Sequence, residues 1–487
     1  MATQISDHQA YDWFSSGIGR PIKSQDATPA LVAIALGILV VGSGSLLAGF
    51  YLRAAFQCYL VLRAKPDVIL PLLISTILTR LDFGDFRSGY NAALMSEHNI
   101  SLLGFEQYAN AIPFLLIPLR TGLAVATART GARGLGLLFA AWLIGLVPVV
   151  FASLRDMGAG EGGWTIGLKE YCVVCSVLYG GAVLHAPISD TRIARRDLLL
   201  FLAFILLVAN LRFFGSKLLF VVDPFAAAMS VWLITRYSPN HIAAGGLLFG
   251  LSLVFCRNST LTVLSTWSLC VVFALCRCLL PRYASLRYTK LAARLALAVS
   301  IIAVSYAIYL SAHEDTRVRG AVTTIQDRIR LKFLGDRAPL WNAAWNDITQ
   351  DPKVVGKNNA GFKQPFDRKE RMWKSGAHNT YLELVQRLGW VAGLAGLLIF
   401  LSGIFGAIRA AASAGVSTYI ACIYLSAAAF MIMNGATGHW PVGTEVGYIP
   451  LMMAGAGLRH VSLMPRMALG RQSHHVAHSV RATALAS

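Results

Sequence analysis

Long apolar runs separated by short polar loops fill most of this chain. A helix needs about 20 apolar residues to cross a bilayer, and runs of that kind occur near 30–50, 110–127, 135–153, 166–186, 218–235, 260–280, 291–312, 388–408, 416–435 and 445–462. Shorter runs near 66–81, 197–211 and 243–256 are also expected to span. Residues 30–63 form either one span with an interfacial piece or a hairpin. The pattern predicts an all-α polytopic membrane protein with roughly 12–14 transmembrane helices and one large extracytoplasmic loop.

The composition points to the same class of protein. Of 487 residues, 56% are hydrophobic and only 14% are charged, whereas soluble domains carry about 25% charged residues. This excludes a disordered chain and argues against a soluble enzyme. The net charge of +19 would suggest a nucleic-acid partner in a soluble protein. In a membrane protein, Lys and Arg collect in cytoplasmic loops instead, so no nucleic-acid partner is expected.

Basic residues alternate between the two sides of the predicted bundle. Loops on one side carry most of them, namely Arg129, Arg133, Arg192, Arg195, Arg196, Arg236, Arg282, Arg287, Lys290, Arg294, Arg409 and the tail residues Arg459, Arg466, Arg471 and Arg481. The alternating short loops carry few, such as Arg87 and Arg155. The positive-inside rule therefore places the first set and the C-terminus in the cytoplasm.

One segment departs from this charge pattern. Residues 313–387 form the long polar stretch on the outer side, with 14 Lys and Arg against 9 Asp and Glu. This segment is either a solvated loop or a site for an anionic ligand. The predicted organisation is a polar tail over 1–28, transmembrane helices over 29–312, this loop, transmembrane helices over 388–462 and a basic cytoplasmic tail over 463–487.

A first helix is predicted in the second half of the loop. Leu340, Ala344, Trp345 and Ile348 lie at helical spacing, and Asp351-Pro352 is expected to end the helix. The following segment is rich in Gly, Asn, Lys and Arg, so its backbone N–H groups can wrap an anion.

A second helix is predicted to begin at His378 and Asn379 and to end at Gly389. An imidazole at a helix N-terminus meets the positive end of the helix dipole, which disfavours its protonated form. Neutral imidazole can act as a general base. The alternative is that His378 only caps the helix and packs at the membrane interface.

Polar residues inside the apolar runs need an explanation of their own. Arg120, Glu170 and Asp223 are intramembrane charges, which are costly and are therefore either functional or paired structural groups. Cys172 and Cys175 form a C-x-x-C within an apolar run. They are interpreted as helix-packing residues, with a redox or metal pair as the alternative.

The two loop helices together resemble a known family. RAPLWNAAWNDITQDPKVVGKNNAGF followed by HNTYLELVQRLGWVAG is similar to the O-antigen ligase and polymerase superfamily of bacterial polysaccharide assembly. The family pattern falls here on Arg337, Trp341, Pro352, Gly356, Gly361, His378, Asn379, Leu382 and Gly389. Cys256-Arg257-Asn258-Ser259 resembles a Ser-Arg pair of the family, with Cys in place of the usual Ser. The turn after Pro352 is longer than the usual Gly-x-Gly.

The resemblance implies a GT-C-like glycosyltransferase of the bacterial inner membrane, with its active site facing the periplasm. Its donor would be a glycan on undecaprenyl diphosphate, and its acceptor a hydroxyl of another lipid-linked glycan or of lipid A-core. The enzyme would be inverting and metal-independent, without a cofactor. Its partners would be the lipid bilayer and the chain-length regulator and flippase of the same pathway.

The resemblance also suggests which residues carry the reaction. His378 is the candidate base or acceptor-orienting group, and Arg257 and Arg337 are candidate clamps for the leaving diphosphate. Further substrate contacts are expected from Asn379, Trp341, Arg212, Lys357, Arg368 and Arg371.

The favoured interpretation is a polysaccharide polymerase of the O-antigen or exopolysaccharide type. An O-antigen ligase shares the motif and is the first alternative. A glycolipid transporter or flippase is the second, because many spans with buried charges fit a substrate pathway. The inverted repeats of many transporters are not visible in this sequence.

The predicted topology can be tested by thiol labelling. In a cysteine-free background, Gln364→Cys is expected to react with a membrane-impermeant maleimide added to intact spheroplasts. Ser189→Cys, next to a predicted cytoplasmic loop, should react only after lysis. Labelling of Gln364→Cys from the cytoplasmic side alone would overturn the orientation.

Overall fold

The computed structural model describes the chain in separate segments. These are residues 31–32, 35–36, 46–63, 100–127, 133–159, 166–184, 229–234, 239–255, 338–356, 362–365, 372–375, 377, 379–411, 418–437 and 448–458. The predicted spans near 66–81, 197–211, 260–280 and 291–312 lie outside these residues.

Helices make up nearly all of the described structure. They are α3 (Leu46–Arg63), α6 (Ile100–Thr127), α7 (Arg133–Gly158), α8 (Ile166–Val174), α9 (Ser176–Val183), α12 (Pro239–Phe255), α16 (Ala338–Gln350), α17 (Thr380–Ala411), α18 (Thr418–Thr437) and a last helical segment, Tyr448–Leu458. The helical prediction is confirmed for these segments. The run near 166–186 differs in detail, because a tightened turn at Cys175 divides it into α8 and α9.

A small β-hairpin is the exception to the all-α prediction. β1 (Phe362–Pro365) pairs antiparallel with β2 (Met372–Ser375), so that Phe362 lies opposite Ser375 and Pro365 opposite Met372. It falls in the segment that the sequence predicts as turn-rich. Neither Phe-Lys-Gln-Pro nor Met-Trp-Lys-Ser alternates apolar and polar residues, so the pattern that signals a strand is missing.

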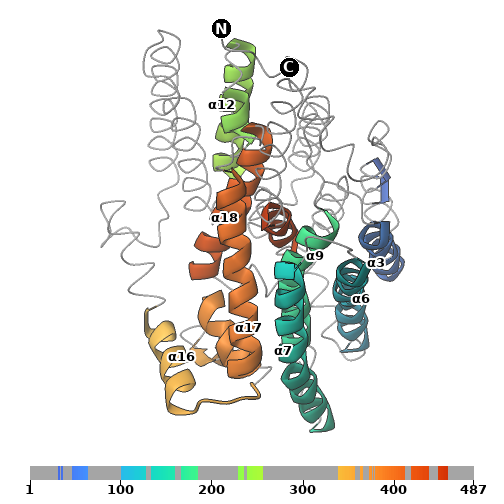
Figure 1. Ribbon diagram of the computed structural model, residues 1–487, viewed down its shortest axis with the longest axis vertical. Helices are drawn as coiled ribbons and strands as arrows, with labels where there is room; N and C mark the ends of the chain where they lie inside the picture. The colour runs from blue at the N-terminus through green and yellow to red at the C-terminus, as the bar shows by residue number, and fades with distance from the viewer. Residues whose placement is uncertain are drawn as a thin grey trace, which may run out of the picture.

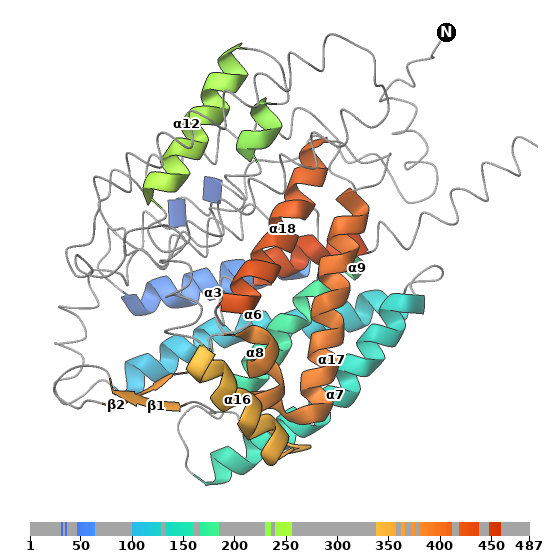
Figure 2. The same ribbon diagram turned by 90° about the vertical axis from the view of Figure 1, so that its left-hand side faces the viewer.

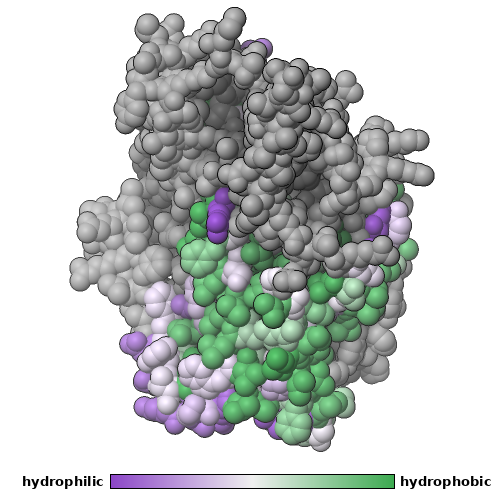
Figure 3. Space-filling view, in the orientation of Figure 1, coloured by the Kyte–Doolittle hydropathy of each residue, from purple (hydrophilic) through white to green (hydrophobic). Residues whose placement is uncertain are grey.

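Two of the described helices are long and apolar enough to cross a membrane. They are α7, over Gly134–Gly158, and α17. Only 28% of the most apolar stretch of α7 is buried, and its exposed side chains form one stripe that includes Leu137, Ile144, Val147, Phe151 and Leu154. Figure 3 shows this apolar face, with polar side chains gathered at its lower rim near α16. An apolar face of this extent is unusual on a protein surrounded by water.

Helix α17 lies at the centre of the described helices (Figures 1 and 2). It packs against α7, α8, α16 and α18, while α6 packs against α3, α8 and α9. The apolar core follows these contacts and includes Tyr171, Tyr179, Phe400 and Phe430, all fully buried. The start of α17, where the candidate site lies, is thus held by several neighbours at once.

Trp142 of α7 and Tyr171 of α8 join their two helices through a reciprocal pair of hydrogen bonds. The indole Nε1–H donates to the Tyr171 carbonyl at 3.0 Å, and the Tyr171 hydroxyl donates to the Trp142 carbonyl at 2.9 Å. The rings stack with centroids 5.4 Å apart. Each aromatic side chain therefore satisfies its polar atom where the core is dry.

Glycines allow α9 to approach the last helical segment closely. A Cβ on Gly180 would collide with the carbonyl of Met452, and a Cβ on Gly455 with the carbonyl of Val177. Backbones touch here because neither helix has a side chain at the crossing. Small residues are used in this way where helices associate within a membrane.

A glycine exchange tests this packing. Gly180→Ala is expected to destabilise the protein by about 1–3 kcal/mol, because the added methyl group must displace backbone. Gly246→Ala in α12 is the matched control, since its Cβ would have no neighbour within 4 Å. It is expected to be neutral or to stabilise by up to about 1 kcal/mol. Thermal unfolding in detergent measures both, and equal shifts would contradict the close approach.

Candidate functional site

The start of α17 is capped by Asn379. Its Oδ1 accepts hydrogen bonds from the backbone N–H groups of Tyr381 at 3.0 Å and Leu382 at 3.2 Å, and its carbonyl accepts from Glu383 N at 2.9 Å. Asn is among the preferred N-cap residues because it satisfies these free N–H groups. The predicted helix start is confirmed, and the side chain of Asn379 is engaged in holding it.

Gly389 divides α17 into two pieces. Its φ of 81° and ψ of 175° lie in a region that only glycine adopts without strain. The helix ends there and resumes at Trp390, whose N–H donates to the Lys353 carbonyl at 2.9 Å. The predicted end signal at Gly389 is thus a break between a short helical piece, residues 380–388, and the apolar piece that follows.

The segment after α16 crosses directly over this break. A Cβ on Gly356 would collide with the Arg387 carbonyl and with Gly389 N, and a Cβ on Gly389 would collide with the Val354 carbonyl. The backbones of the two segments therefore touch at these glycines, where a side chain would not fit. Both belong to the family pattern described above, 33 positions apart in the sequence.

The C-terminal end of α7 reaches the same crossing. Arg155 Nη2 donates to the Gly356 carbonyl at 3.3 Å and contacts Asp156 Oδ1 at 2.6 Å. Asp156 is buried while Arg155 is about half exposed. Arg155, one of the few basic residues on the predicted outer side, thereby holds the loop next to the kink of α17.

A buried ion pair connects the start of α17 to α8. Arg387 Nη1 donates to Glu170 Oε1, and their side chains are 13% and 4% exposed. Glu383, one helical turn before Arg387 and 1% exposed, also attracts the guanidinium electrostatically. Glu170 is one of the three intramembrane charges that the sequence leaves unpaired, and the structure identifies its partner. Of the others, Arg120 is half buried, and Asp223 lies outside the described residues.

Helix α16 packs against another face of the part of α17 that precedes Gly389. Leu340, Ala344 and Ile348 form its buried face as predicted, whereas Trp345, which the spacing groups with them, is 56% exposed. Gln386 Nε2 donates to Asp347 Oδ2 at 3.0 Å. Two consecutive residues of α17, Gln386 and Arg387, thus attach it to two different helices.

The structure describes only part of the predicted site. Trp341 lies partly buried on α16, and Asn379 caps α17. The other predicted site residues lie outside the described residues, and their roles stay predictions: His378, Arg337, Arg257, Arg212, Lys357, Arg368 and Arg371. In the sequence, His378 is the residue that precedes Asn379, the cap of α17.

Two other features bear on the chemistry available. Cys172 and Cys175 are free thiols, 2% and 0% exposed, which agrees with a packing role at the α8–α9 turn. Within the described ranges, no group of three His, Cys, Asp or Glu side chains could hold a metal ion.

No family model, curated protein or solved structure matches this chain.

The buried ion pair gives a stability prediction. Arg387→Met is expected to lower the free energy of unfolding by about 3–5 kcal/mol, because it removes the guanidinium that is paired with the buried Glu170 and attracted by the buried Glu383. Glu170→Gln should cost less, since Arg387 keeps Glu383 nearby. Urea unfolding in detergent measures the differences.

Arg409→Met, the same substitution at the exposed far end of α17, is the control and should stay within about 0.5 kcal/mol of the unmodified protein. If Arg387→Met and Arg409→Met lowered the free energy of unfolding equally, the ion pair between Arg387 and Glu170 would not stabilise the protein.

Proposed function

We propose that this protein is a bacterial inner-membrane polysaccharide polymerase. It transfers a growing glycan from undecaprenyl diphosphate to a hydroxyl of an acceptor lipid-linked repeat unit at the periplasmic face. The observation that carries the proposal is the contact between Gly356 and Gly389. Gly356 and Gly389 are far apart in the sequence and both are positions of the family pattern. They pack together at the break in the helix that follows His378.

The proposed protein has roughly 12–14 transmembrane spans. Helices α7 and α17 are the two described helices that are long and apolar enough to be such spans. The exposed apolar stripe of α7 supports a lipid environment, because lipid tails remove the cost of exposing it. The hydrogen bond from Arg155 to Gly356 supports the topology. It joins two loops that the positive-inside pattern independently assigns to the outer side.

The reaction assigns a separate task to each kind of residue. His378, neutral at the start of α17, takes the proton of the acceptor hydroxyl as that oxygen forms a bond to the anomeric carbon. The bond from this carbon to the undecaprenyl diphosphate oxygen breaks on the opposite face, so the configuration inverts. The electron pair leaves on the diphosphate.

Cationic side chains stabilise the leaving diphosphate. Arg257 and Arg337 are proposed to clamp it, since a guanidinium binds phosphate oxygens in a bidentate manner. Further contacts along the anionic donor are proposed for Arg212, Lys357, Arg368 and Arg371. The surplus of basic residues in 313–387 fits a substrate that carries negative charge to this side of the membrane.

Lipid-linked glycans in a deletion strain test the proposal. Loss of the gene is expected to leave single repeat units on the carrier lipid, and the unmodified gene should restore polymer. Full-length chains retained on the carrier would instead show an O-antigen ligase. A pool confined to the inner leaflet would show a flippase.

The base assignment is tested in the same strain with His378→Ala. The variant is expected to reach the membrane in normal amount and to leave single repeat units, because no group takes the hydroxyl proton. His474→Ala, in the basic tail, is the matched control and should restore polymer. Normal polymer length with His378→Ala would contradict the assignment of His378 as the base.

A further inference from the structure

The β-hairpin pairs two lysines of the outer loop. In the register of β1 and β2, Lys363 is the partner of Lys374. Partners in an antiparallel pair share one face, and like charges opposite each other are destabilising. A hairpin of two strands is itself only marginally stable in water. The face that carries the two lysines, the lysine face, therefore favours an anionic surface on which the hairpin can lie.

The lysine face carries no acidic residue. Its other register pair is Pro365 with Met372, two positions along each strand and about 7 Å away. The opposite face, the neutral face, has the four uncharged residues Phe362, Gln364, Trp373 and Ser375. The two faces thus differ in kind, because only the lysine face combines positive charge with apolar residues.

Both ends of the hairpin are tied to helices that are long enough to cross a membrane. Phe362 follows Gly356 by six residues, so it lies within about 21 Å of the loop position that Arg155 of α7 holds. Ser375 precedes Asn379, the cap of α17, by four residues, which span at most about 14 Å. The hairpin can therefore reach the surface of the membrane into which α7 and α17 are proposed to insert.

The hairpin sequence is complementary to a surface of anionic headgroups. Residues 362–375 contain five Lys and Arg against two Asp and Glu. Basic segments beside a membrane are attracted by anionic lipids, and apolar residues among them enter the boundary between headgroups and acyl chains. The lysine face offers both kinds of contact.

We infer that the lysine face binds the phosphate groups of anionic phospholipids at the outer surface of the membrane. The inference rests on the membrane topology proposed above and is independent of the reaction. The hairpin lies flat on the lipid, with its neutral face away from it. An anchored hairpin also keeps Arg368 and Arg371, which lie between its strands in the sequence, at the level of the donor diphosphate.

Fluorescence quenching in lipid nanodiscs measures the orientation of the hairpin. In a cysteine-free full-length chain, Met372→Cys places a fluorescent maleimide on the lysine face, and Gln364→Cys places it on the neutral face. A phospholipid with a nitroxide on its headgroup is the quencher. In nanodiscs rich in phosphatidylglycerol, the label at 372 is expected to be quenched more strongly than the label at 364. In phosphatidylcholine alone this difference should disappear.

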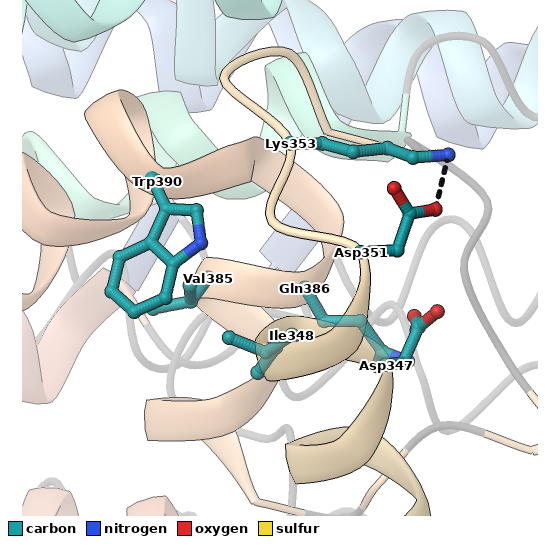
Figure 4. A pocket seen from close by; sticks show the side chains of 7 residues that line it. All are labelled: Asp347, Ile348, Asp351, Lys353, Val385, Gln386 and Trp390. Carbon is teal, nitrogen blue, oxygen red and sulfur yellow. Dashed lines mark hydrogen bonds and ion pairs between the residues drawn. The ribbon is translucent and has the colours of Figure 1, made fainter.

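The lysines are tested by removing and by keeping their charge. Lys374→Gln is expected to lower the ratio of membrane-bound to free hairpin about fivefold, and Lys363→Gln with Lys374→Gln about 25-fold, because each lysine near an anionic surface contributes separately. Lys363→Arg with Lys374→Arg should retain the quenching, which separates loss of charge from loss of the hairpin. Lys353→Gln is the matched control and should have no effect, because the Lys353 ammonium is already paired with Asp351 at 2.9 Å (Figure 4).

Three results would overturn the inference. They are equal quenching of both labels in phosphatidylglycerol, equal effects of Lys374→Gln and Lys353→Gln, or strong quenching in phosphatidylcholine that contains only a trace of undecaprenyl diphosphate. The last result would assign the lysines to the donor lipid. None of them depends on the glycans that accumulate in the deletion strain. A ligase or a flippase found there would overturn the polymerase and leave this inference standing.

Discussion

The described structure depends on one close crossing, where the segment after α16 passes over the break in α17. Gly389 needs a backbone conformation that other residues avoid, and Gly356 needs the space that a Cβ would fill. The Lys353 carbonyl accepts the N–H of Trp390, a group that the break would otherwise leave without its helical partner. The ion pair between Arg387 and Glu170 lies next to this crossing, because the carbonyl of Arg387 faces Gly356.

The piece of α17 before Gly389, residues 380–388, is held by polar contacts on two of its faces. Successive helix positions point about 100° apart, so Gln386 reaches Asp347 of α16 while Arg387 reaches Glu170 of α8. Hydrogen bonds are directional, so these two contacts restrict how this piece can rotate or slide. For the proposed glycosyl transfer this restriction would matter, because small displacements of a reacting group are costly.

Features of the candidate site that depend on neighbouring residues are easier to predict from the sequence than contacts between residues far apart in the chain. The end of α16 before Asp351-Pro352, the start of α17 and the end signal at Gly389 were predictable, because each depends on residues within one or two turns. The cap at Asn379 was not predicted, since His378 was the residue considered for that role. The pairing of Glu170 with Arg387 was not, since 217 positions separate them. An unpaired Glu in an apolar run signals only that a partner exists. The exposure of Trp345 was missed because spacing alone cannot locate the edge of a buried face.

The break at Gly389 also separates the start of α17 from the long apolar piece that follows. A membrane-spanning helix adjusts its tilt to the thickness of the surrounding hydrocarbon layer. In a continuous helix that tilt would swing the outer end sideways. Here the outer piece is bound to α8 and α16, so the glycine can absorb the change of angle. The orientation of residues 380–388 would then depend less on the thickness of the bilayer, which would suit the lipid-linked donor proposed above.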